Sequence, residues 1–307
     1  MDDDMPFDIK QTYLKFLEED PQLTMPVAAI QSLVALLADA QPKTSAELIE
    51  VLQEASQTLK DSVPNSISLS AGSDLFLRFV VRNIHDYSDW EACKRNLVEN
   101  GRTFAERAKE SRSLIARLGL PFVRDNDIIL VHGRSRAVHQ LLELAASKHV
   151  RFQVYVTEAR VCAEGQIAAA AFRKLGIPTC MIPDSSVGYV IPKVHKVFLG
   201  AEGVAESGGV INQIGSSQVV MLAHQFKKPV FVLAESHKFV RLFPLSSDDL
   251  TTETPYTFTT TETEEFDPAN GPQIDFTPHK YITALITDLG VLTPSGVSEE
   301  LIKIWFG

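Results

Sequence analysis

Short apolar runs alternate with helical segments through the second part of the chain, and this alternation limits the possible folds more than any other feature. Six strand-like runs follow Leu120, at residues 128–131, 152–156, 179–182, 196–199, 230–233 and 284–287. Helical segments lie between several of them, at 135–147, 164–175 and 216–226. Because strands that alternate with helices form βαβ units, residues 119–307 are predicted to form a Rossmann-like α/β domain with a mostly parallel, doubly wound sheet.

The first part of the chain has a helical period instead. Apolar residues recur at helical spacing, and Thr44 and Glu47 form a capping box that opens one of the segments. Helices are predicted at 7–19, 27–38, 44–60, 71–86 and 89–118. Since no strong strand pattern interrupts these segments, residues 1–118 are predicted to form a helical domain of the bundle type.

Composition excludes several classes of function. The chain has 307 residues, 45% of them hydrophobic, and a net charge of −10, so it can bury a core but lacks the basic face of a non-specific nucleic-acid binder. Its 3 cysteines are widely spaced, which suggests neither a disulfide framework nor a zinc site. No apolar run is long enough to span a membrane, and the acidic residues 2–4 are unlike a presequence. We therefore expect a cytosolic protein with no metal, no direct nucleic-acid partner and no membrane association.

Residues 244–278 break the alternation of strands and helices. The segment is rich in Asp, Glu and Thr, contains several Pro and has no Lys or Arg. A long, acidic, partly mobile surface loop is the expected structure. A docking or regulatory element is the alternative.

Polar residues follow the predicted strands at their carboxyl ends, where open α/β sheets bind ligands. After the run at 196–199 come Glu202 and a glycine-rich segment, in which glycines allow positive φ and close approach of backbone N–H groups. The predicted ligand-binding residues are His132, Gly133, Arg134, Ser135, Arg160, Asp184, Glu202, Asn212, Ser216 and Lys238. Their cations and the nearby helix N-termini suit an anion such as a sugar phosphate. Helix capping by Ser135, Asp184 and Ser216 is the alternative for those three residues.

Catalysis at this pocket is not expected. Glu202 or His132 could be a general acid or base, but no nucleophile with an evident base accompanies them. The best-placed position for a nucleophile is Gly133, which has no side chain, and Cys162 is better explained as a small packed residue. No Walker A motif is present and the glycine-rich segment does not fit GxGxxG, so neither a nucleotide nor another cofactor is expected.

Several separated motifs occur in a familiar order along the chain. They are YLKFLEED, MPVAAIQSLVALL and NSISLSAGSDLFLRFVVRN in the first part, then VHGRSRAV, VYVTEAR, GAEGVAESGGVINQIGS, AESHKFVRLFPL and ITDLGVLTPSGVSEELI. Together they resemble the family of translation initiation factor 2B alpha subunits, with a fungal character, over nearly the whole chain. That family is part of a wider one that includes methylthioribose-1-phosphate and ribose-1,5-bisphosphate isomerases.

The catalytic residues of the isomerases are only partly matched. Those enzymes have a Cys at the position of Gly133 and an Asp at that of Glu202, and a Lys follows their loop Asn where this chain has Gln213. The resemblance therefore implies that the nucleophile and one phosphate-binding cation are missing and that the acid/base group is one methylene longer, whereas proton transfer needs a close fit. A sugar-phosphate-binding protein or a diverged sugar-phosphate isomerase is the alternative function.

The resemblance implies a non-catalytic regulatory subunit of the guanine-nucleotide exchange factor that acts on translation initiation factor 2. It implies a decamer that joins a homodimer of this chain to the beta, gamma, delta and epsilon subunits. The phosphorylated alpha subunit of initiation factor 2 would be a further partner, and its binding would inhibit exchange in the integrated stress response.

Two surfaces are predicted for these partners. The residues expected to recognise the phosphorylated partner are Thr44, Glu47, Phe76, Arg78 and Arg82. The apolar block expected at the homodimer interface comprises 282–292, Leu301, Ile302, Ile304, Trp305 and Phe306. An ordinary solvated helix face and simple core packing are the respective alternatives.

Overall fold

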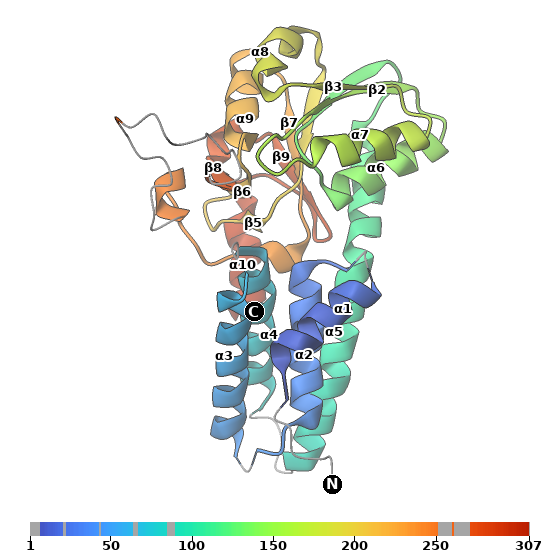
Figure 1. Cartoon of the computed structure of the whole chain (residues 1–307). Helices are drawn as coiled ribbons and strands as arrows, with labels where there is room; N and C mark the ends of the chain where they lie inside the picture. The colour runs from blue at the N-terminus through green and yellow to red at the C-terminus, as the bar shows by residue number, and fades with distance from the viewer. Residues whose placement is uncertain are drawn as a thin grey trace. The chain divides into compact units, whose positions relative to one another are not determined.

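The chain divides into two units, Met1–Glu110 and Ser111–Gly307 (Figure 1). The computed structural model describes residues 7–20, 23–42, 44–63, 67–84, 90–250, 260 and 271–306. The side chains of residues 90, 91 and 304–306 lie outside this description, which leaves out Ile304, Trp305 and Phe306 of the predicted dimer block. The sequence placed the division at 118/119, near the end of a helix that contributes to both units.

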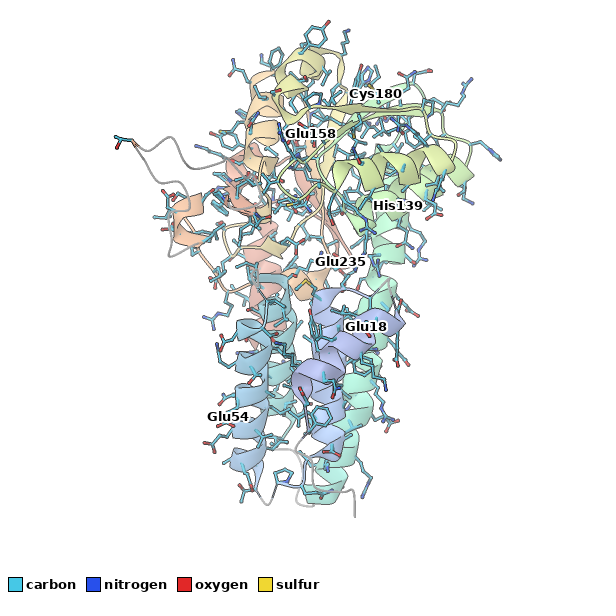
Figure 2. All side chains as sticks on the ribbon, in the orientation of Figure 1. Glu18, Glu54, His139, Glu158, Cys180 and Glu235 are labelled. Carbon is cyan, nitrogen blue, oxygen red and sulfur yellow. The ribbon has the colours of Figure 1, made fainter. Side chains whose placement is uncertain are left out.

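The first unit is helical, as predicted. Its helices are α1 (Ile9–Glu19), α2 (Met25–Asp39), α3 (Ser45–Asp61), α4 (Ile67–Asn83) and α5 (Trp90–Gly119). Asp8 caps α1, and Thr44 caps α3 by accepting a hydrogen bond from the Glu47 N–H at 3.2 Å. The apolar stripes of these helices form one core, while charged side chains such as Glu54 point outward (Figure 2).

The main sheet of the second unit contains all six predicted strands. They are β1 (Asp127–Val131), β2 (Phe152–Thr157), β3 (Thr179–Ile182), β4 (Lys196–Leu199), β7 (Val230–Leu233) and β9 (Ala284–Thr287), which are mutually parallel where they pair. Antiparallel β10 (Gly290–Leu292) completes the order β10-β9-β7-β4-β1-β2-β3. The strand order therefore reverses between β1 and β4, which is where ligands bind in folds of this kind.

Helices cover both faces of this sheet. One core joins the end of α5 to α6 (Arg136–Ser147) and α7 (Gly165–Lys174), and a second core joins α8 (Val187–Val190), α9 (Ser216–Gln225) and α10 (Gly296–Phe306). Along β1, Ile129 and Val131 enter the first core and Leu130 enters the second, as the alternation of side chains in a strand requires. The doubly wound architecture is thus confirmed.

A second, three-stranded sheet was not predicted. It has the order β5-β6-β8 and consists of β5 (Gly203–Val204), β6 (Val210–Gln213) and β8 (Ile274–Thr277). Two of these strands lie in the glycine-rich segment, and β8 lies in the segment 244–278 that was expected to be a surface loop. All four residues of β8 are buried, so the loop prediction is wrong for this stretch, whereas residues 251–259 and 261–270 lie outside the described residues.

None of the helices that the structure describes is long and apolar enough to cross a lipid bilayer.

Candidate functional site

The predicted ligand-binding residues gather at one edge of the main sheet. His132 to Ser135 follow β1, Arg160 follows β2, Asp184 follows β3, Glu202 follows β4 and Lys238 follows β7. Asn212 lies on β6 and Ser216 begins α9. Glu158 and Glu235, which also follow strands at this edge, are labelled in Figure 2. The contacts of each residue decide what this edge can do.

His132 is a structural residue at this edge. Its Nδ1 lies 2.7 Å from Thr157 Oγ1, and its Nε2 lies 2.8 Å from the Ile214 carbonyl oxygen. Since a carbonyl only accepts, Nε2 carries the hydrogen and Nδ1 accepts from the threonine hydroxyl. The ring is 2% exposed, and this burial lowers the pKa of His132. A neutral imidazole with both nitrogens engaged is not a free general base.

Gly133 faces a side chain that occupies the space beside it. Its φ is +65°, and a Cβ added to it would lie 1.9 Å from Gln213 Oε1. Gln213 is held there because its Nε2 donates to Glu164 Oε2 at 2.7 Å. Glu164 in turn lies 4.0 Å from the Arg134 guanidinium. The Gln213 amide therefore fills the volume into which a side chain at position 133 would project.

Asp184 and Ser135 support the backbone. The two carboxylate oxygens of Asp184 accept the N–H groups of Ala159 and Arg160, each at 3.0 Å, and so hold the turn after β2, in which Ala159 has a φ of +46°. Ser135 caps α6 by accepting from the Val138 N–H at 3.3 Å. Helix capping, the alternative that the sequence left open, therefore accounts for Ser135, whereas Asp184 caps no helix and instead holds the turn after β2.

A carboxylate that the sequence analysis missed occupies the N-terminus of α9. Asp275 Oδ2 accepts the N–H groups of Gly215 at 2.8 Å and Ser217 at 3.0 Å. Burial, which outweighs these hydrogen bonds, raises the pKa of Asp275 to about 7. Beside it, Asn212 Nδ2 donates to Ser216 Oγ at 2.8 Å, and Ser216 Oγ donates to the Gln213 carbonyl at 2.7 Å. The anion position expected at this helix N-terminus is thus already filled by the protein.

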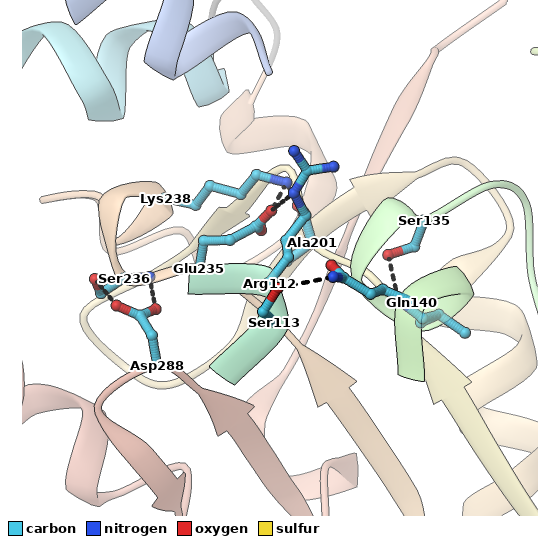
Figure 3. A network of polar contacts seen from close by, with 10 residues as sticks. Arg112, Ser113, Ser135, Gln140, Ala201, Glu235, Ser236, Lys238 and Asp288 are labelled. Atoms are coloured by element: carbon cyan, nitrogen blue, oxygen red, sulfur yellow. Dashed lines mark hydrogen bonds and ion pairs between the residues drawn. The ribbon is translucent and has the colours of Figure 1, made fainter. Parts of the chain in front are cut away.

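Lys238 belongs to a buried charge network (Figure 3). Its Nζ donates to the Ala201 carbonyl at 2.8 Å and lies 3.2 Å from Glu235 Oε2, while Arg112 Nε lies 3.9 Å from Glu235 Oε1. Burial opposes the ionisation of Glu235, but the nearby cations, Lys238 foremost, hold its pKa at about 2. Lys238 is therefore committed to a structural ion pair, and Arg112, which lies on α5, is a residue that the pattern of strand ends did not reveal.

Ser236 and Asp288 connect the carboxyl ends of the neighbouring strands β7 and β9. Asp288, just after β9, accepts from the Ser236 N–H and the Ser236 hydroxyl, both at 2.7 Å (Figure 3). This pair fixes the loop after β7, on which Glu235 and Lys238 lie.

Among the predicted ligand-binding residues, all of which the structure describes, Arg134, Arg160 and Glu202 remain to face solvent. The Arg134 side chain is 42% exposed, Arg160 is exposed and Glu202 is half-buried. Burial raises the pKa of the Cys162 thiol, and the carboxylates of Glu164 and Glu202 raise it further, so this thiol is protonated and a poor nucleophile. Among the residues that the structure describes, no three His, Cys, Asp or Glu side chains gather to hold a metal ion.

The predicted recognition face in the first unit is only partly a surface. Thr44 and Glu47 are exposed at the start of α3, Arg82 is exposed and Arg78 is half-buried on α4. Phe76 is 0% exposed and packs in the helical core, with its ring centroid 6.0 Å from that of Phe79. Phe76 therefore contributes to stability and offers no contact to a partner, which corrects its place in the predicted face.

Comparisons with known proteins identify relatives over nearly the whole chain. Residues 18–294 match the family model described as the initiation factor 2 subunit family. The translation initiation factor eIF2B subunit alpha of Dictyostelium discoideum is 38% identical over 95% of this chain and 94% of that protein. The same subunit of Caenorhabditis elegans is 32% identical over 94% of this chain and 95% of that protein. The resemblance found in the sequence motifs is confirmed.

Enzymes and solved structures are also among the similar proteins. The ribose 1,5-bisphosphate isomerase of Pyrococcus furiosus is 29% identical over 86% of this chain and 83% of that enzyme. The tetrameric eIF2B beta2-delta2 complex of Chaetomium thermophilum contains a chain with TM-score 0.78 and 20% identity, over 97% of this chain and 95% of that one. The translation initiation factor eIF-2B of Pyrococcus horikoshii has TM-score 0.70 and 22% identity, over 94% and 98%. At these identities the solved structures support the fold.

Proposed function

The chain belongs to the initiation factor 2 subunit family, and from that premise we propose that it is a non-catalytic regulatory subunit of the exchange factor acting on translation initiation factor 2. The observation that carries this proposal is the 38% identity, over 95% of the chain, to a subunit named eIF2B alpha. The protein works in the cytosol, as an alpha-type subunit that joins the beta, gamma, delta and epsilon subunits.

Loss of isomerase chemistry is part of the proposal. The resemblance to the isomerases implies a cysteine at the position of Gly133, and in this chain the Gln213 amide occupies the volume beside that position. His132 is neutral and engaged at both nitrogens, and the Cys162 thiol has a raised pKa. These contacts support a sheet edge that is braced internally and at which, in the part of the chain that the structure describes, neither His132 nor Cys162 is an activated catalytic group.

Assembly with a second copy is proposed to use the C-terminal block. Its members Ile282, Leu285, Ile286 and Leu301 are buried in the core of the second unit, so core packing accounts for them. Leu289, Val291 and Ile302 are 42%, 43% and 56% exposed and are available for contact. Val291→Asp with Ile302→Asp is expected to shift the protein from dimer to monomer in analytical ultracentrifugation, and a wild-type chain that is monomeric at all concentrations would contradict this.

Regulation follows from linkage between binding and the state of the complex. A partner that binds one arrangement of the complex more tightly than another shifts the population toward it. A phosphoserine adds about −1.5 to −2 charges, which cations such as Arg82 on α4 can recognise. The phosphorylated alpha subunit of initiation factor 2 is the proposed partner at the helical unit.

The test is nucleotide exchange by the reconstituted complex with and without this chain. Release of a labelled guanine nucleotide from initiation factor 2 is followed while its phosphorylated form is added. We expect strong inhibition when the chain is present and weak inhibition when it is omitted. Equal inhibition in both complexes would overturn the regulatory role.

A sugar-phosphate-binding function is the second candidate because Arg134 and Arg160 reach solvent at the same sheet edge. Titration with ribose 1,5-bisphosphate should raise the thermal midpoint of unfolding if this edge binds the ligand, and Arg160→Ala should abolish the rise. A midpoint that stays constant in the wild type would remove this candidate. The same samples, assayed for a changed sugar product, test the diverged-isomerase alternative.

A further inference from the structure

The edge of the main sheet at the amino ends of its strands, opposite the candidate site, carries several lysines. These lysines lie in segments that contain no acidic residue. Segments 185–201, 207–234 and 276–287 include Lys193, Lys227, Lys228 and Lys280 but neither Asp nor Glu, in a chain whose net charge is −10. These segments lead into β4, β7 and β9, which are adjacent and parallel. Their amino ends therefore lie side by side, and the lysines that precede them converge.

A cavity of about 560 Å³ lies among these segments. Its lining consists of His224, Gln225, Lys227, Lys228, Lys280, Tyr281, Ile282 and Thr283. Lys228 Nζ donates to the Pro192 carbonyl at 3.0 Å, which brings Lys193 to the same edge. The cavity is thus lined by cations from two loops and bordered by a third.

Aromatic rings accompany the lysines. Lys280 Nζ lies 4.9 Å from the centroid of the Tyr281 ring, which also packs edge-on against His224 at 5.1 Å between centroids. Lys193 Nζ lies 5.6 Å from the ring of Tyr189, which is 79% exposed. Exposed tyrosine beside cations is typical of surfaces that contact other proteins.

The charges of these lysines are not neutralised within the described part of the chain. There, none of the four ammonium groups lies within ion-pair distance of a carboxylate, whereas Lys196, in the same acid-free region, pairs with Asp127 at 2.7 Å. A larger cavity of about 780 Å³ at the starts of β1, β2 and β3 differs because its Arg151 lies 3.6 Å from Asp125. The lysine-lined edge therefore produces a local positive potential on a molecule whose net charge is negative.

We propose that Lys193, Lys227, Lys228 and Lys280 form a docking surface for a short acidic polypeptide segment of a partner protein. Charge complementarity favours an acidic occupant, and the limited patch favours a short one. An extended nucleic acid would continue beyond the patch across a surface whose overall charge repels it. A lone phosphate is a poorer match, because the cations are spread over three loops with no buried charged side chain among them.

The experiment measures binding of fluorescein-labelled deca-glutamate to the full chain by fluorescence anisotropy. Wild type is expected to bind, with affinity that falls as salt rises from about 50 to about 200 mM, because exposed charges are screened. Lys227→Glu, Lys228→Glu and Lys280→Glu together should weaken binding at least about tenfold, since they reverse the field at the cavity. A matched triple variant at exposed lysines elsewhere, Lys10→Glu, Lys148→Glu and Lys174→Glu, should change affinity less than about twofold.

The outcomes separate the possible occupants. An equal loss in both triple variants, or no loss in the first, would overturn the proposal. Tighter binding of a ten-nucleotide oligouridylate that the cavity variant abolishes would also overturn it, in favour of nucleic acid. The triple variant at Lys227, Lys228 and Lys280 could lose its folded circular-dichroism spectrum. In that case the milder double variant Lys227→Gln and Lys280→Gln, both at exposed positions, must also weaken binding of deca-glutamate.

Discussion

At the scale of single residues, the sheet edge is shaped by pairs of side chains whose partners are far apart in the sequence. Gln213 fills the space beside Gly133, His132 links Thr157 to the Ile214 carbonyl, and Asp275 takes the first amides of α9. The residue types at positions 132, 133 and 213 were visible in the sequence, but their mutual contacts were not. A cleft expected to receive an anion is therefore partly occupied by the amide and carboxylate groups of the chain itself.

Substituting Gly133 tests how firmly Gln213 fills this space. Gly133→Ala should destabilise the protein, because a positive φ costs an alanine about 1–2 kcal/mol and the clash with Gln213 adds about 1–3 kcal/mol. Gly176→Ala is the matched control, since its φ is +75° and nothing lies within 4 Å of the added Cβ. Urea unfolding should show a larger loss of stability for Gly133→Ala than for Gly176→Ala. Adding Gln213→Ala to Gly133→Ala should recover only the part of the loss that comes from the clash. Equal losses for the two glycine variants would mean that Gln213 moves aside easily.

The raised pKa of Asp275 predicts a pH-dependent stability. Because this pKa is about 7 in the folded chain and lies near 3.9 in an unfolded one, the proton stabilises the fold at acidic pH. That stabilisation is full below the unfolded value and is lost as pH rises through about 7, a change of up to about 4 kcal/mol. Asp275→Asn should therefore gain stability relative to wild type between pH 5 and pH 8, by about 2–3 kcal/mol, because this interval covers only part of the full change.

Urea unfolding at both pH values measures this difference, with Asp248→Asn, at an exposed position, as the control. A difference between wild type and Asp275→Asn that stays constant with pH would show that the carboxylate titrates normally.

At the scale of elements, the six strands of the main sheet and the helix caps followed directly from local patterns. Apolar runs bounded by turn residues marked the strands, and Ser135 and Thr44 are caps because a hydroxyl beside a helix start reaches a free N–H. The sheet β5-β6-β8 did not follow, because strands of two to four residues among glycines show no alternation. Because β8 contains the polar residues Asp275 and Thr277, its sequence is similar to that of the acidic loop around it. All four of its residues are nevertheless buried.

The predicted recognition face on α3 and α4 combines one buried residue, Phe76, with residues that are exposed on the surface. Phe76→Ala should cost about 3–5 kcal/mol of folding free energy, because it removes a fully buried ring. Arg82→Glu, at an exposed position, should leave the thermal midpoint within the error of measurement and should weaken inhibition of exchange by the phosphorylated partner severalfold.

The reconstituted exchange assay and differential scanning calorimetry together check both variants. Inhibition that persists unchanged in Arg82→Glu, and also in Glu47→Lys, would remove this face from the account.

At the scale of the whole molecule, the two-part organisation and the doubly wound class were predictable, and so was the family. They depend on periodicity and on motifs that remain in register over most of the chain. The inside of the candidate site was less predictable, because Arg112, Glu164 and Asp275 reach it from distant segments. The converging lysines at the other edge were hidden for the same reason: only the strand order β9-β7-β4 brings their three segments together.

We propose that this member of the initiation factor 2 subunit family acts by holding partner subunits and performs no chemistry of its own. The most direct measurement is isolation of the tagged chain from its own cells at native abundance, with quantitative mass spectrometry of the co-purified polypeptides and an assay for ribose 1,5-bisphosphate conversion. We expect recovery of the beta, gamma, delta and epsilon subunits in amounts equal to this chain, with no conversion of the sugar phosphate. Isolation of the chain without those subunits, together with conversion of the sugar phosphate, would contradict this proposal.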